Sequence, residues 1–539
     1  MITRRKALGF LSGLPFGGFF LGGQTNLVKA GDIKGSTVTE GQKAGKSIYA
    51  SIGVRPVINA RGTVTIIGAS RVLPEVQQAM DEAVKDYVQI DELMEGVAAR
   101  LAELTRAEWG IVTTGASGAI TVATAGCITG GDPDKLWQLP DLTGMKNEVI
   151  IPSYSRSAYD AAAKAVGVRM VEVESPEELK LALGPKAAMI MVMAGARSEN
   201  GPLSLKEIAA LAKPLGIPVL VDAAAEGIEV PNPHLLQGAD LVAYSGGKYL
   251  RGPQCAGLLI GRKDLVNSAW ITSAPHHGFG RGFKVGREEI MGMLTAVEMW
   301  FKRDHAEEWR TWTSWADHIS KKLKQVKGVK TELVQPRGRS NRSPSLLVEW
   351  DTAVIPLTGE DVETLLWEGN PRIAVSGAGS FLPFPPNINP NITINTSQLK
   401  SGEERLIADR VYEVLSTPHL KSKPTASPEF EVNGQWDLEM KFAASTVQQK
   451  LILEQKGNNL IGTHQADFGP RDLNGTLYGR KILMRSSFTR QGVRLNFTFS
   501  GIVSKDAMEG QVSLGEYGQA EWKAKRHQYK PAGGSPIKG

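Results

Sequence analysis

Cysteine is scarce in this chain, since only Cys127 and Cys255 occur among 539 residues. Two cysteines can form neither a disulfide framework nor a zinc site, so we expect both to be small buried hydrophobes. The 59 glycines follow no three-residue repeat, which excludes a collagen-like chain. Hydrophobic residues make up 42% and charged residues 22%, as in a globular protein, and the length indicates two or three domains.

The sequence also lacks a strong excess of either charge outside its two ends. Its net charge is +6, but residues 31–429 contain 43 basic and 46 acidic side chains. The positive charge comes from residues 1–30 and from residues 430–539, which contain 15 basic and 10 acidic side chains. A nearly neutral body offers no bulk electrostatic attraction to nucleic acid, so we do not expect a nucleic-acid partner.

Residues 1–30 have the pattern of a bacterial export signal. Arg4, Arg5 and Lys6 precede a short apolar stretch, and small residues follow near Ala30. An arginine pair, an apolar segment and a cleavage site are the parts of a twin-arginine (Tat) signal peptide. The stretch is too short and too rich in glycine to span a bilayer stably, and no later segment reaches that length. We predict a periplasmic or secreted bacterial protein without stable membrane insertion; a buried N-terminal helix is the alternative.

The following residues divide into segments of different character. Residues 31–50 indicate a flexible leader, and residues 417–429 a polar linker. Between them, residues 51–329 alternate apolar β runs, such as 188–192, with helical stretches. This alternation predicts an α/β domain with a mostly parallel central sheet and helices on both faces. Residues 330–416 are shorter and mixed, and predict a smaller α+β domain.

Residues 430–539 form a different module. Alternating strands and regularly spaced glycine turns predict a small antiparallel β barrel or sandwich. The sequence of this module shows no acid pair, metal cluster or nucleophile arrangement. A stabilising or oligomerising accessory and a ligand-binding module both remain open as its role.

The most informative residues are Asp222 and Lys248. Asp222 ends the apolar strand in PVLVDAAA, and Lys248 follows a second strand on the glycine-rich loop of DLVAYSGGKYLRGP. Ligands of parallel α/β sheets bind at the carboxyl ends of the strands, so we expect both residues at one crevice. Pyridoxal phosphate (PLP) needs this pair, because a lysine holds its aldehyde as a Schiff base and a carboxylate keeps its ring nitrogen protonated. We therefore predict PLP as the cofactor.

Further residues are predicted to bind the cofactor phosphate. Ser245 lies three residues before Lys248, within reach of the cofactor. The sequence IVTTGASGA at 111–119 predicts a strand that turns into a helix through small residues. A helix N-terminus favours an anion through its free N–H groups and its dipole. The phosphate-binding residues predicted from this turn are Thr114, Gly115, Ala116 and Ser117.

Two further motifs carry a family resemblance. INARGTVTIIG at 58–68 and GRGFKVGREE at 280–289 resemble motifs of a fold-type I PLP-dependent family. That family contains selenocysteine synthase (L-seryl-tRNA(Sec) selenium transferase) and D-glucosaminate-6-phosphate ammonia-lyase. The resemblance spans roughly residues 50–415. It implies a homodimer or larger homo-oligomer with the site at a subunit interface, and it places Arg61 and Lys284 near the substrate or the cofactor phosphate.

The loop after the strand near residue 150 departs from many fold-type I enzymes. Those enzymes place a histidine or another aromatic residue against the cofactor ring, whereas Ser155 stands at that position here and Tyr154 precedes it. Arg156 is a candidate to contact a phosphate or carboxylate of the substrate, or else a solvated loop residue. Arg372 lies in the smaller domain, where relatives often bind the substrate carboxylate, and an arginine can grip a carboxylate through two hydrogen bonds.

The sequence therefore predicts a PLP-dependent lyase. Lys248 acts as general base, and elimination of water and ammonia from a hydroxy-amino acid or amino-sugar acid is implied by the resemblance. The alternatives are a seryl-tRNA selenium transferase, an aminotransferase or racemase on the same fold, and a non-catalytic exported binding protein. No metal is expected, because adjacent His276 and His277 lack a third ligand. Three tryptophans at helical spacing predict a buried or interface stripe: Trp309, Trp312 and Trp315.

Overall fold

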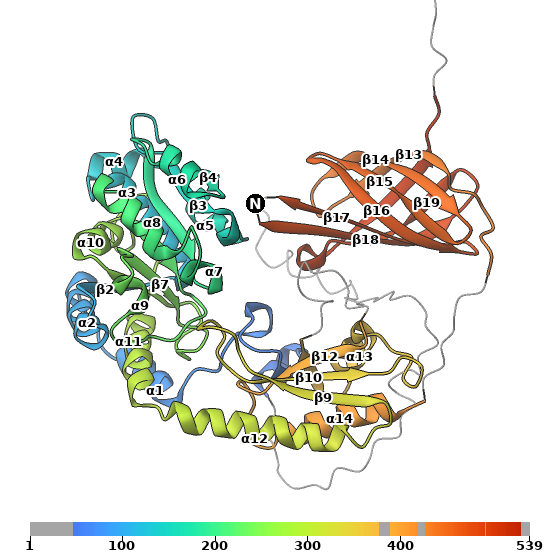
Figure 1. Cartoon of the computed structure of the whole chain (residues 1–539), viewed down its shortest axis with the longest axis horizontal. Coiled ribbons are helices and arrows are strands. Elements are labelled where there is room, and N and C mark those ends of the chain that lie inside the picture. Colours follow the sequence, from blue (N-terminus) through green and yellow to red (C-terminus); the bar gives the residue numbers. More distant parts are fainter. Residues whose placement is uncertain (1–46, 377–388, 419–425, 491, 530–539) are drawn as a thin grey trace, which may run out of the picture.

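A computed structural model describes residues 47–376, 389–418, 426–490 and 492–529 (Figure 1). The predicted export signal, most of the leader and part of the linker lie outside the described residues. Three main hydrophobic cores divide the described chain into a large domain, a small domain and a barrel. Among the helices of the described residues, none is long and apolar enough to cross a membrane.

The large domain is built on a seven-stranded sheet. Its order is β2-β8-β7-β6-β5-β3-β4, and all neighbours are parallel except that β8 runs antiparallel to β2 and β7. The strands are β2 (Trp109–Thr113), β3 (Glu148–Pro152), β4 (Arg169–Val173), β5 (Ala187–Met193), β6 (Val219–Asp222), β7 (Leu241–Ser245) and β8 (Gly257–Gly261).

Helices cover this sheet on both faces. Every residue of β6 and β8 is buried, although successive side chains of a strand point to opposite faces. The helix α3 (Gly115–Thr129) packs on β8, β7, β6 and β5. The other helices of the domain are α1 (Pro74–Ala83), α2 (Ile90–Thr105), α4 (Pro133–Gln138), α5 (Asp160–Lys164), α6 (Pro176–Ala182), α7 (Ala196–Glu199), α8 (Leu205–Ala212), α9 (Pro233–Leu236), α10 (Lys263–Ile271) and α11 (Arg287–Lys302).

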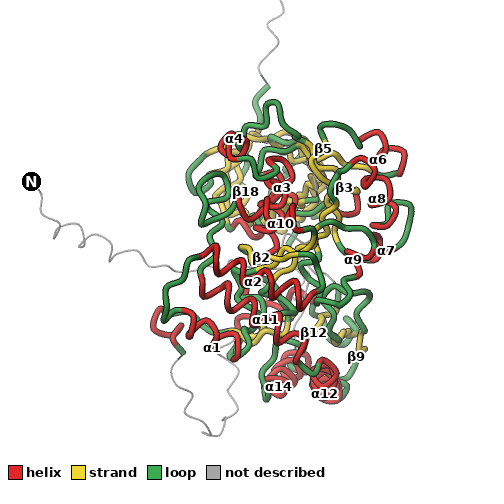
Figure 2. The backbone as a smooth tube through the Cα atoms, turned by 90° about the vertical axis from the view of Figure 1, so that its left-hand side faces the viewer, coloured by secondary structure: helices red, strands yellow, loops and turns green. Residues whose placement is uncertain are grey.

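The small domain combines an antiparallel sheet with three helices. The sheet has the order β12-β10-β9, with β9 (Val329–Val334), β10 (Ser345–Trp350) and β12 (Asn391–Asn395). Its helices are α12 (His305–Leu323), α13 (Gly359–Glu368) and α14 (Glu403–Ser416), of which α12 and α14 lie side by side (Figure 2). A separate parallel pair joins β1 (Val57–Ala60) to β11 (Arg372–Val375).

The hydrophobic contacts place two elements with the small domain that we predicted within residues 51–329. Ile58 and Ala60 of β1 belong to the small-domain core, as do Ala316 and Ile319 of α12. Pairing with β11 draws β1 into this core, and the apolar face of α12 packs on α14 and β9. The chain therefore starts its described part in the small domain and enters the large domain afterwards.

The C-terminal module is a closed barrel rather than a sandwich. Each of its eight strands pairs antiparallel with the next, and β20 pairs with β13. The strands are β13 (Gly434–Lys441), β14 (Thr446–Lys456), β15 (Asn459–Ala466), β16 (Gly469–Tyr478), β17 (Lys481–Arg490), β18 (Val493–Val503), β19 (Ala507–Ser513) and β20 (Gln519–Arg526). Alternating buried and exposed residues, as along β13, fill the interior with side chains.

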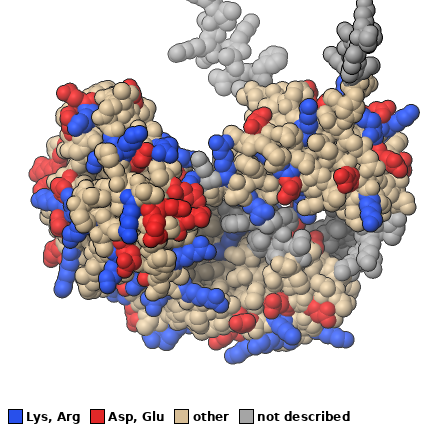
Figure 3. Space-filling view, turned by 45° about the horizontal axis from the view of Figure 1, so that its top comes forward, with Lys and Arg blue, Asp and Glu red and all other residues tan. Residues whose placement is uncertain are grey.

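The barrel contacts both other domains. Its β17–β18 hairpin reaches toward the large domain (Figure 1), where Gly492 lies so close that an added Cβ would be 2.4 Å from Ser157 N. On the small domain, Arg485 Nη2 lies 3.9 Å from Glu360 Oε2. On the face shown in Figure 3, basic and acidic side chains are interspersed and a recess lies between the three parts. Short 3-10 helices complete the fold: η1 (Ile48–Ile52), η2 (Thr65–Ile67), η3 (Ser153–Ser155), η4 (Lys213–Leu215) and η5 (Gly515–Tyr517).

Candidate active site

Asp222 and Lys248 lie together, as the sequence predicts. Asp222 is the last residue of β6, and Lys248 follows the carboxyl end of β7, the parallel neighbour of β6. The Asp222 side chain is buried, and its Oδ1 accepts a hydrogen bond from Ala224 N at 3.0 Å. The two side chains lie near enough that each charge acts on the pKa of the other.

Burial dominates the electrostatics of this pair. It raises the pKa of Asp222, which the Ala224 hydrogen bond and the Lys248 charge partly offset. It lowers the pKa of Lys248, while the Asp222 carboxylate acts in the opposite direction. A lysine with a lowered pKa has more of its amine in the neutral, nucleophilic form at neutral pH. The lowered pKa of Lys248 therefore favours attack of its amine on an aldehyde carbon.

The backbone of the lysine loop (residues 246–253) is tightly held. Gly246 N donates to Ala256 O at 2.8 Å, and Gly252 N donates to Gly246 O at 2.9 Å. A Cβ at position 246 would lie 2.6 Å from Met293 Sδ and 2.7 Å from Ala256 O, so only glycine fits there. Ser70 N donates to Gly247 O at 3.1 Å, which ties the loop to the segment after β1. These contacts fix the backbone position from which the Lys248 side chain extends.

The predicted phosphate-binding turn lies next to the end of β7. Ser245 pairs with Gly257, and a Cβ at Gly257 would be only 2.4 Å from the carbonyl carbon of Gly115 and 2.7 Å from Ala116 N. The first turn of α3 therefore packs directly on the strand beside Ser245. Ser117 is exposed at this turn, and Gly115 has a positive φ of 70°.

This turn fits a phosphate group. Thr114 is the N-cap of α3, and its Oγ1 is buried without a hydrogen-bond partner among the described residues. The first N–H groups of a helix have no partner within the helix, and its dipole favours an anion there. Together with the buried acid and the lysine of lowered pKa, the donor set fits PLP: α3 for the phosphate, Lys248 for the aldehyde and Asp222 for the ring nitrogen.

The loop after β3 has its polar groups bound within the large domain. Tyr154 Oη donates to Leu203 O at 2.7 Å, and burial raises the pKa of Tyr154 to about 12. Ser155, at the position we aligned with a ring-stacking histidine, is fully buried and its Oγ accepts from Met193 N at 3.0 Å. Ser155 therefore anchors the loop to the end of β5.

The predicted arginines are distributed among different environments. Arg61 is buried in the small domain, with Nη1 3.6 Å from Glu363 Oε1. Arg156 donates to Asp160 Oδ2 and to Glu172 Oε2, both at 2.6 Å. These two carboxylates compensate for the loss of hydration of the nearly buried guanidinium, and they bind Nε and Nη1, two of its three nitrogens. Substrate binding by Arg156 remains a prediction without geometric support.

Arg372 and Arg61 lie at opposite ends of the β1–β11 pair. Arg372 is opposite Val57 at the start of both strands, whereas Arg61 follows the last residue of β1. The guanidinium of Arg372 lies over the Trp367 ring at 4.6 Å, and its Nε donates to Trp367 O at 3.0 Å. Within the described ranges, no contact joins Arg372 to Lys248 or Asp222.

Lys284 follows Phe283, which packs near the predicted phosphate-binding turn. The Phe283 ring approaches the position of a Cβ on Gly118 of α3 to 3.9 Å. Phe283 is one of two features that the sequence analysis missed. The other is a buried pair beside Asp222, in which His234 Nε2 lies 2.7 Å from Glu226 Oε2. Glu226 lies four residues after Asp222, and this spacing was the available signal for a second acid near the site.

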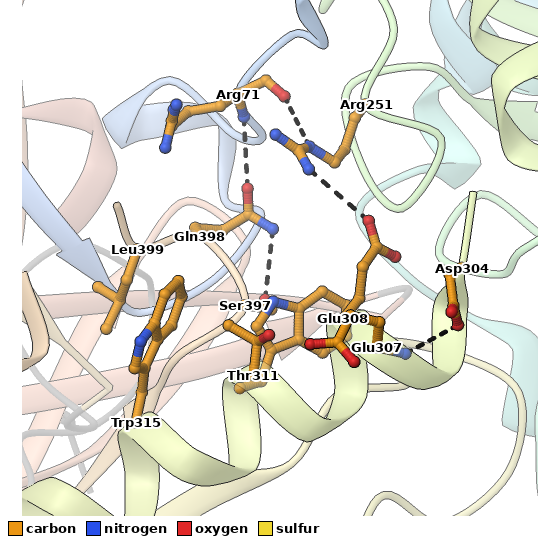
Figure 4. Close-up of a pocket in the computed structure, with 11 residues that line it drawn as sticks. Arg71, Arg251, Asp304, Glu307, Glu308, Thr311, Trp315, Ser397, Gln398 and Leu399 are labelled. Atoms are coloured by element: carbon orange, nitrogen blue, oxygen red, sulfur yellow. Dashed lines mark hydrogen bonds and ion pairs between the residues drawn. The ribbon is translucent and has the colours of Figure 1, made fainter. Parts of the chain in front are cut away.

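A cavity of about 280 Å³ lies on another side of the lysine loop (Figure 4). Arg251, three residues after Lys248, lines it together with Arg71, whose backbone carbonyl accepts from Arg251 Nε at 3.1 Å. Trp312 and Trp315 of the predicted tryptophan stripe also line it, from α12. Neither Asp222 nor Lys248, the predicted catalytic pair, lines this cavity.

Two minor predictions can be compared with the structure. Among the described residues, no group of three or more histidine, cysteine or acidic side chains could hold a metal, and His276 Nε2 instead lies 3.1 Å from Asp91 Oδ1. Cys127 packs against the large-domain core, but Cys255 is exposed. The expectation that both cysteines are buried was therefore wrong for Cys255, which lies at the surface between the lysine loop and β8.

Comparisons with known proteins agree with this geometry. Residues 161–346, which include Asp222 and Lys248, match the aminotransferase class-V family. D-glucosaminate-6-phosphate ammonia lyase of Salmonella typhimurium is 36% identical over 264 residues, covering 47% of this chain and 69% of that protein. A solved structure of D-glucosaminate-6-phosphate ammonia-lyase superposes with a TM-score of 0.60 at 28% identity, covering 69% of this chain and 98% of that chain.

Two more distant relatives match a smaller share of their own length. The 5'-C-glycyluridine monooxygenase-decarboxylase of Streptomyces sp is 32% identical over 261 residues, covering 46% of this chain and 64% of that protein. L-seryl-tRNA(Sec) selenium transferase of Moorella thermoacetica is 24% identical over 315 residues, covering 53% of this chain and 63% of that protein.

Proposed function

This chain belongs to the fold-type I family of PLP-dependent enzymes that includes D-glucosaminate-6-phosphate ammonia lyase, and on that premise we propose that it is an ammonia-releasing lyase. The resemblance, the fold class and the cofactor predicted from the sequence are thereby confirmed. The observation that carries the proposal is the mutual influence of Asp222 and Lys248 at the ends of β6 and β7, together with the packing of the first turn of α3 on β8 next to Ser245. The proposed substrate is an amino-sugar acid or another hydroxy-amino acid.

The position of each residue determines its proposed role toward the cofactor. When bound, PLP supplies an electron-accepting ring that stabilises negative charge on the substrate carbon beside the amine. Asp222, at the end of β6, holds a proton at the ring nitrogen, because a nearby anion raises the pKa of that nitrogen. The first turn of α3 and Ser245 would hold the PLP phosphate.

Lys248 then moves the proton that starts the elimination. Its Nζ takes a proton from the carbon that carries the substrate amine, and the neighbouring carbon loses its hydroxyl, which leaves as water. Water then adds to the carbon that carries the amine, and ammonia leaves, so that the net products are a 2-oxo acid and ammonia. A positioned general base contributes about 10²–10⁴-fold to such a step.

Release of ammonia without an acceptor tests the proposal. D-glucosaminate 6-phosphate, D-glucosaminate and serine are incubated with the PLP-loaded protein in the absence of any 2-oxo acid. Equal amounts of ammonia and a 2-oxo acid product, both lost in Lys248→Ala, would support the lyase. Amine transfer that occurs only after a 2-oxo acid is added would show an aminotransferase instead.

A transferase that acts on seryl-tRNA is the second candidate, because L-seryl-tRNA(Sec) selenium transferase is also a relative. The charge of the body argues against it, since residues 31–429 have 43 basic and 46 acidic side chains. Proteins that bind nucleic acid neutralise several phosphates with lysine and arginine. A gel-shift titration of this protein with tRNA at low salt is expected to show no complex.

The proposal includes export through the Tat pathway, because Arg4 and Arg5 precede the apolar stretch of residues 1–30. In a bacterial host, the full chain is expected in the periplasmic or secreted fraction. Replacing both arginines by lysine should leave it in the cytoplasm. A chain that is exported equally well after that double substitution would contradict Tat export.

Self-association is also proposed, since the resemblance implies a homo-oligomer with the site at a subunit interface, where Arg61 and Lys284 would lie near the substrate or the cofactor phosphate. Light scattering on the purified protein gives its mass in solution. A mass of at least twice 58.1 kDa is expected, and a monomer that retains full activity would contradict the shared site.

A further inference from the structure

The barrel interior is not wholly apolar, because a polar cluster lies inside it. His464 and Arg471 are paired opposite each other on β15 and β16, and both are buried, with 0% and 5% of their surface exposed. Ser486 and Gln449 complete the cluster, through hydrogen bonds to His464 Nδ1 at 2.9 Å and Nε2 at 2.6 Å. Neighbouring interior positions are apolar or aromatic. Charged side chains are rarely buried this deeply without a partner, so the cluster requires a physical reason.

The two ends of the barrel differ. At one end, Arg526 lies over the Trp436 ring at 4.4 Å and donates to Asn433 O and Glu431 O, both at 2.7 Å. The Trp436 side chain beneath this arginine is fully buried. At the other end, five residues near the polar cluster are only half-buried, namely Val447, Gln449, Phe488, Leu495 and Phe497, whereas Met440, Ala466 and Val512 at the same end are buried. Solvent therefore reaches the edge of the filled interior at the end where Arg471 lies, which we call the open end.

Arg471 crosses this open end with its guanidinium largely uncompensated. Its Nε and Nη1 are buried and have no hydrogen-bond partner in the part of the chain that the structure describes. The guanidinium lies over the Phe497 ring at 4.4 Å and near the Phe488 ring at 5.7 Å. Ring faces attract a cation but accept no strong N–H hydrogen bond. The buried N–H donors thus point to a missing acceptor.

The only counter-charge that acts on Arg471 among the described side chains is the partial one of Asp467, which raises its pKa against the effect of burial. Burial and the charge of Arg471 lower the pKa of His464 to about 3, so His464 is neutral at physiological pH. Asp467, on the turn between β15 and β16, is exposed, and it is not within ion-pair distance of Arg471. Ser486 and Gln449 are neutral. The open end therefore has a net positive charge, lined on one side by aromatic rings.

We propose that the open end of the barrel is a binding site for a small organic anion. The carboxylate or phosphate of the ligand accepts hydrogen bonds from Arg471, whose planar fork matches such groups. The apolar body of the ligand packs against Phe488 and Phe497. A barrel of eight strands has an interior just large enough for side chains or one small ligand, which limits the ligand to a small one. This site is separate from the Lys248–Asp222 pair and does not depend on the reaction proposed for it.

Calorimetric titration of the full, PLP-saturated chain tests the site. The probes are benzoate, phenyl phosphate and the neutral isostere benzamide. At least one of the two anions is expected to bind, and benzamide is not. Arg471→Met should weaken anion binding by at least about tenfold, because it removes charge-assisted hydrogen bonds. Comparing benzoate with phenyl phosphate shows which anionic group the site prefers.

The matched control is Arg494→Met, which removes an exposed arginine from β18 of the same barrel. It should bind the anion as the unchanged chain does. Anions that enter the catalytic site would bind all variants equally, so only the difference at position 471 reports on the barrel. The proposal fails if neither anion binds, if benzamide binds as tightly, or if Arg471→Met retains full affinity.

A second variant keeps the test valid if Arg471→Met does not fold. Arg471→Lys keeps a positive charge in the same interior but lacks the planar fork. It should bind the anion at least about tenfold more weakly than the unchanged chain. Equal affinity in this variant would contradict recognition by the guanidinium. Catalytic activity is not measured in these titrations, so their failure leaves the proposed lyase reaction untouched.

Discussion

At the scale of single residues, the crevice depends on opposing effects of burial on two charges. Burial lowers the pKa of Lys248 and raises that of Asp222, and each charge partly offsets the shift of the other. Coulombic coupling of this kind is reciprocal, so removing the charge of Asp222 must change the pKa of Lys248. The pair is thus the place where a pH measurement is most informative.

Asp222→Asn removes the carboxylate that raises the pKa of Lys248. The pKa of Lys248 should therefore fall further, and its amine should become neutral at lower pH. The rate at which the cofactor-free protein attaches PLP is followed by absorbance between about pH 6 and 10, a range that covers a lowered and an ordinary lysine pKa. In the variant, this rate should reach its plateau at lower pH. An unchanged or higher midpoint would contradict the coupling.

The residue scale also shows what the sequence can and cannot predict. Asp222 and Lys248 were predicted because strand ends are marked locally by apolar runs, and parallel strands bring their carboxyl ends together. Arg156 was proposed for substrate because its ion pair with Glu172 depends on the pairing of β3 with β4, although its other partner, Asp160, is only four residues away. Strand pairing is a tertiary contact, and the local sequence around Arg156 does not reveal it.

At the scale of elements, α3 and β8 must approach closely to form the phosphate-binding turn. Gly257→Ala would place a Cβ 2.4 Å from Gly115 C and 2.6 Å from Tyr244 O, so the first turn of α3 must shift. We expect a loss of about 1–3 kcal/mol of stability from overpacking and a weaker affinity for PLP. Thermal unfolding and a PLP titration measure the two effects.

Gly96→Ala in α2 is the control for that substitution, because an added Cβ there meets nothing within 4 Å. Alanine in a helix interior is favoured over glycine by about 0.5–1 kcal/mol, so this variant should be unchanged or slightly more stable. If Gly257→Ala behaved like Gly96→Ala, the close packing of β8 on α3 would not be needed for the site.

The types of the elements were largely predictable, whereas the membership of two elements was not. Alternating apolar runs predicted the parallel sheet, and glycine-spaced strands predicted the C-terminal β module. β1 and α12 were placed with their sequence neighbours, but their apolar residues pack in the small-domain core. The partner of β1 is β11, about 315 residues later, and sequence periodicity does not reveal such distant pairings.

At the scale of the whole molecule, the barrel has its own hydrophobic core. One ion pair, Arg485 with Glu360 at 3.9 Å, is partly exposed, and such pairs contribute about 0–1 kcal/mol. A chain that ends at residue 418 should therefore still fold and bind PLP with an unchanged visible absorption band. Loss of PLP binding on truncation would show that the barrel completes the catalytic site.

The central claim is that Lys248 holds the cofactor. Reduction of the PLP-loaded protein with borohydride fixes the cofactor to its lysine, and peptide mapping by mass spectrometry then locates the label. We predict a single pyridoxyl label on Lys248, which is absent from Lys248→Ala together with the visible absorption band. A label on another lysine, such as Lys284, or no label in a protein that turns over substrate, would contradict the account.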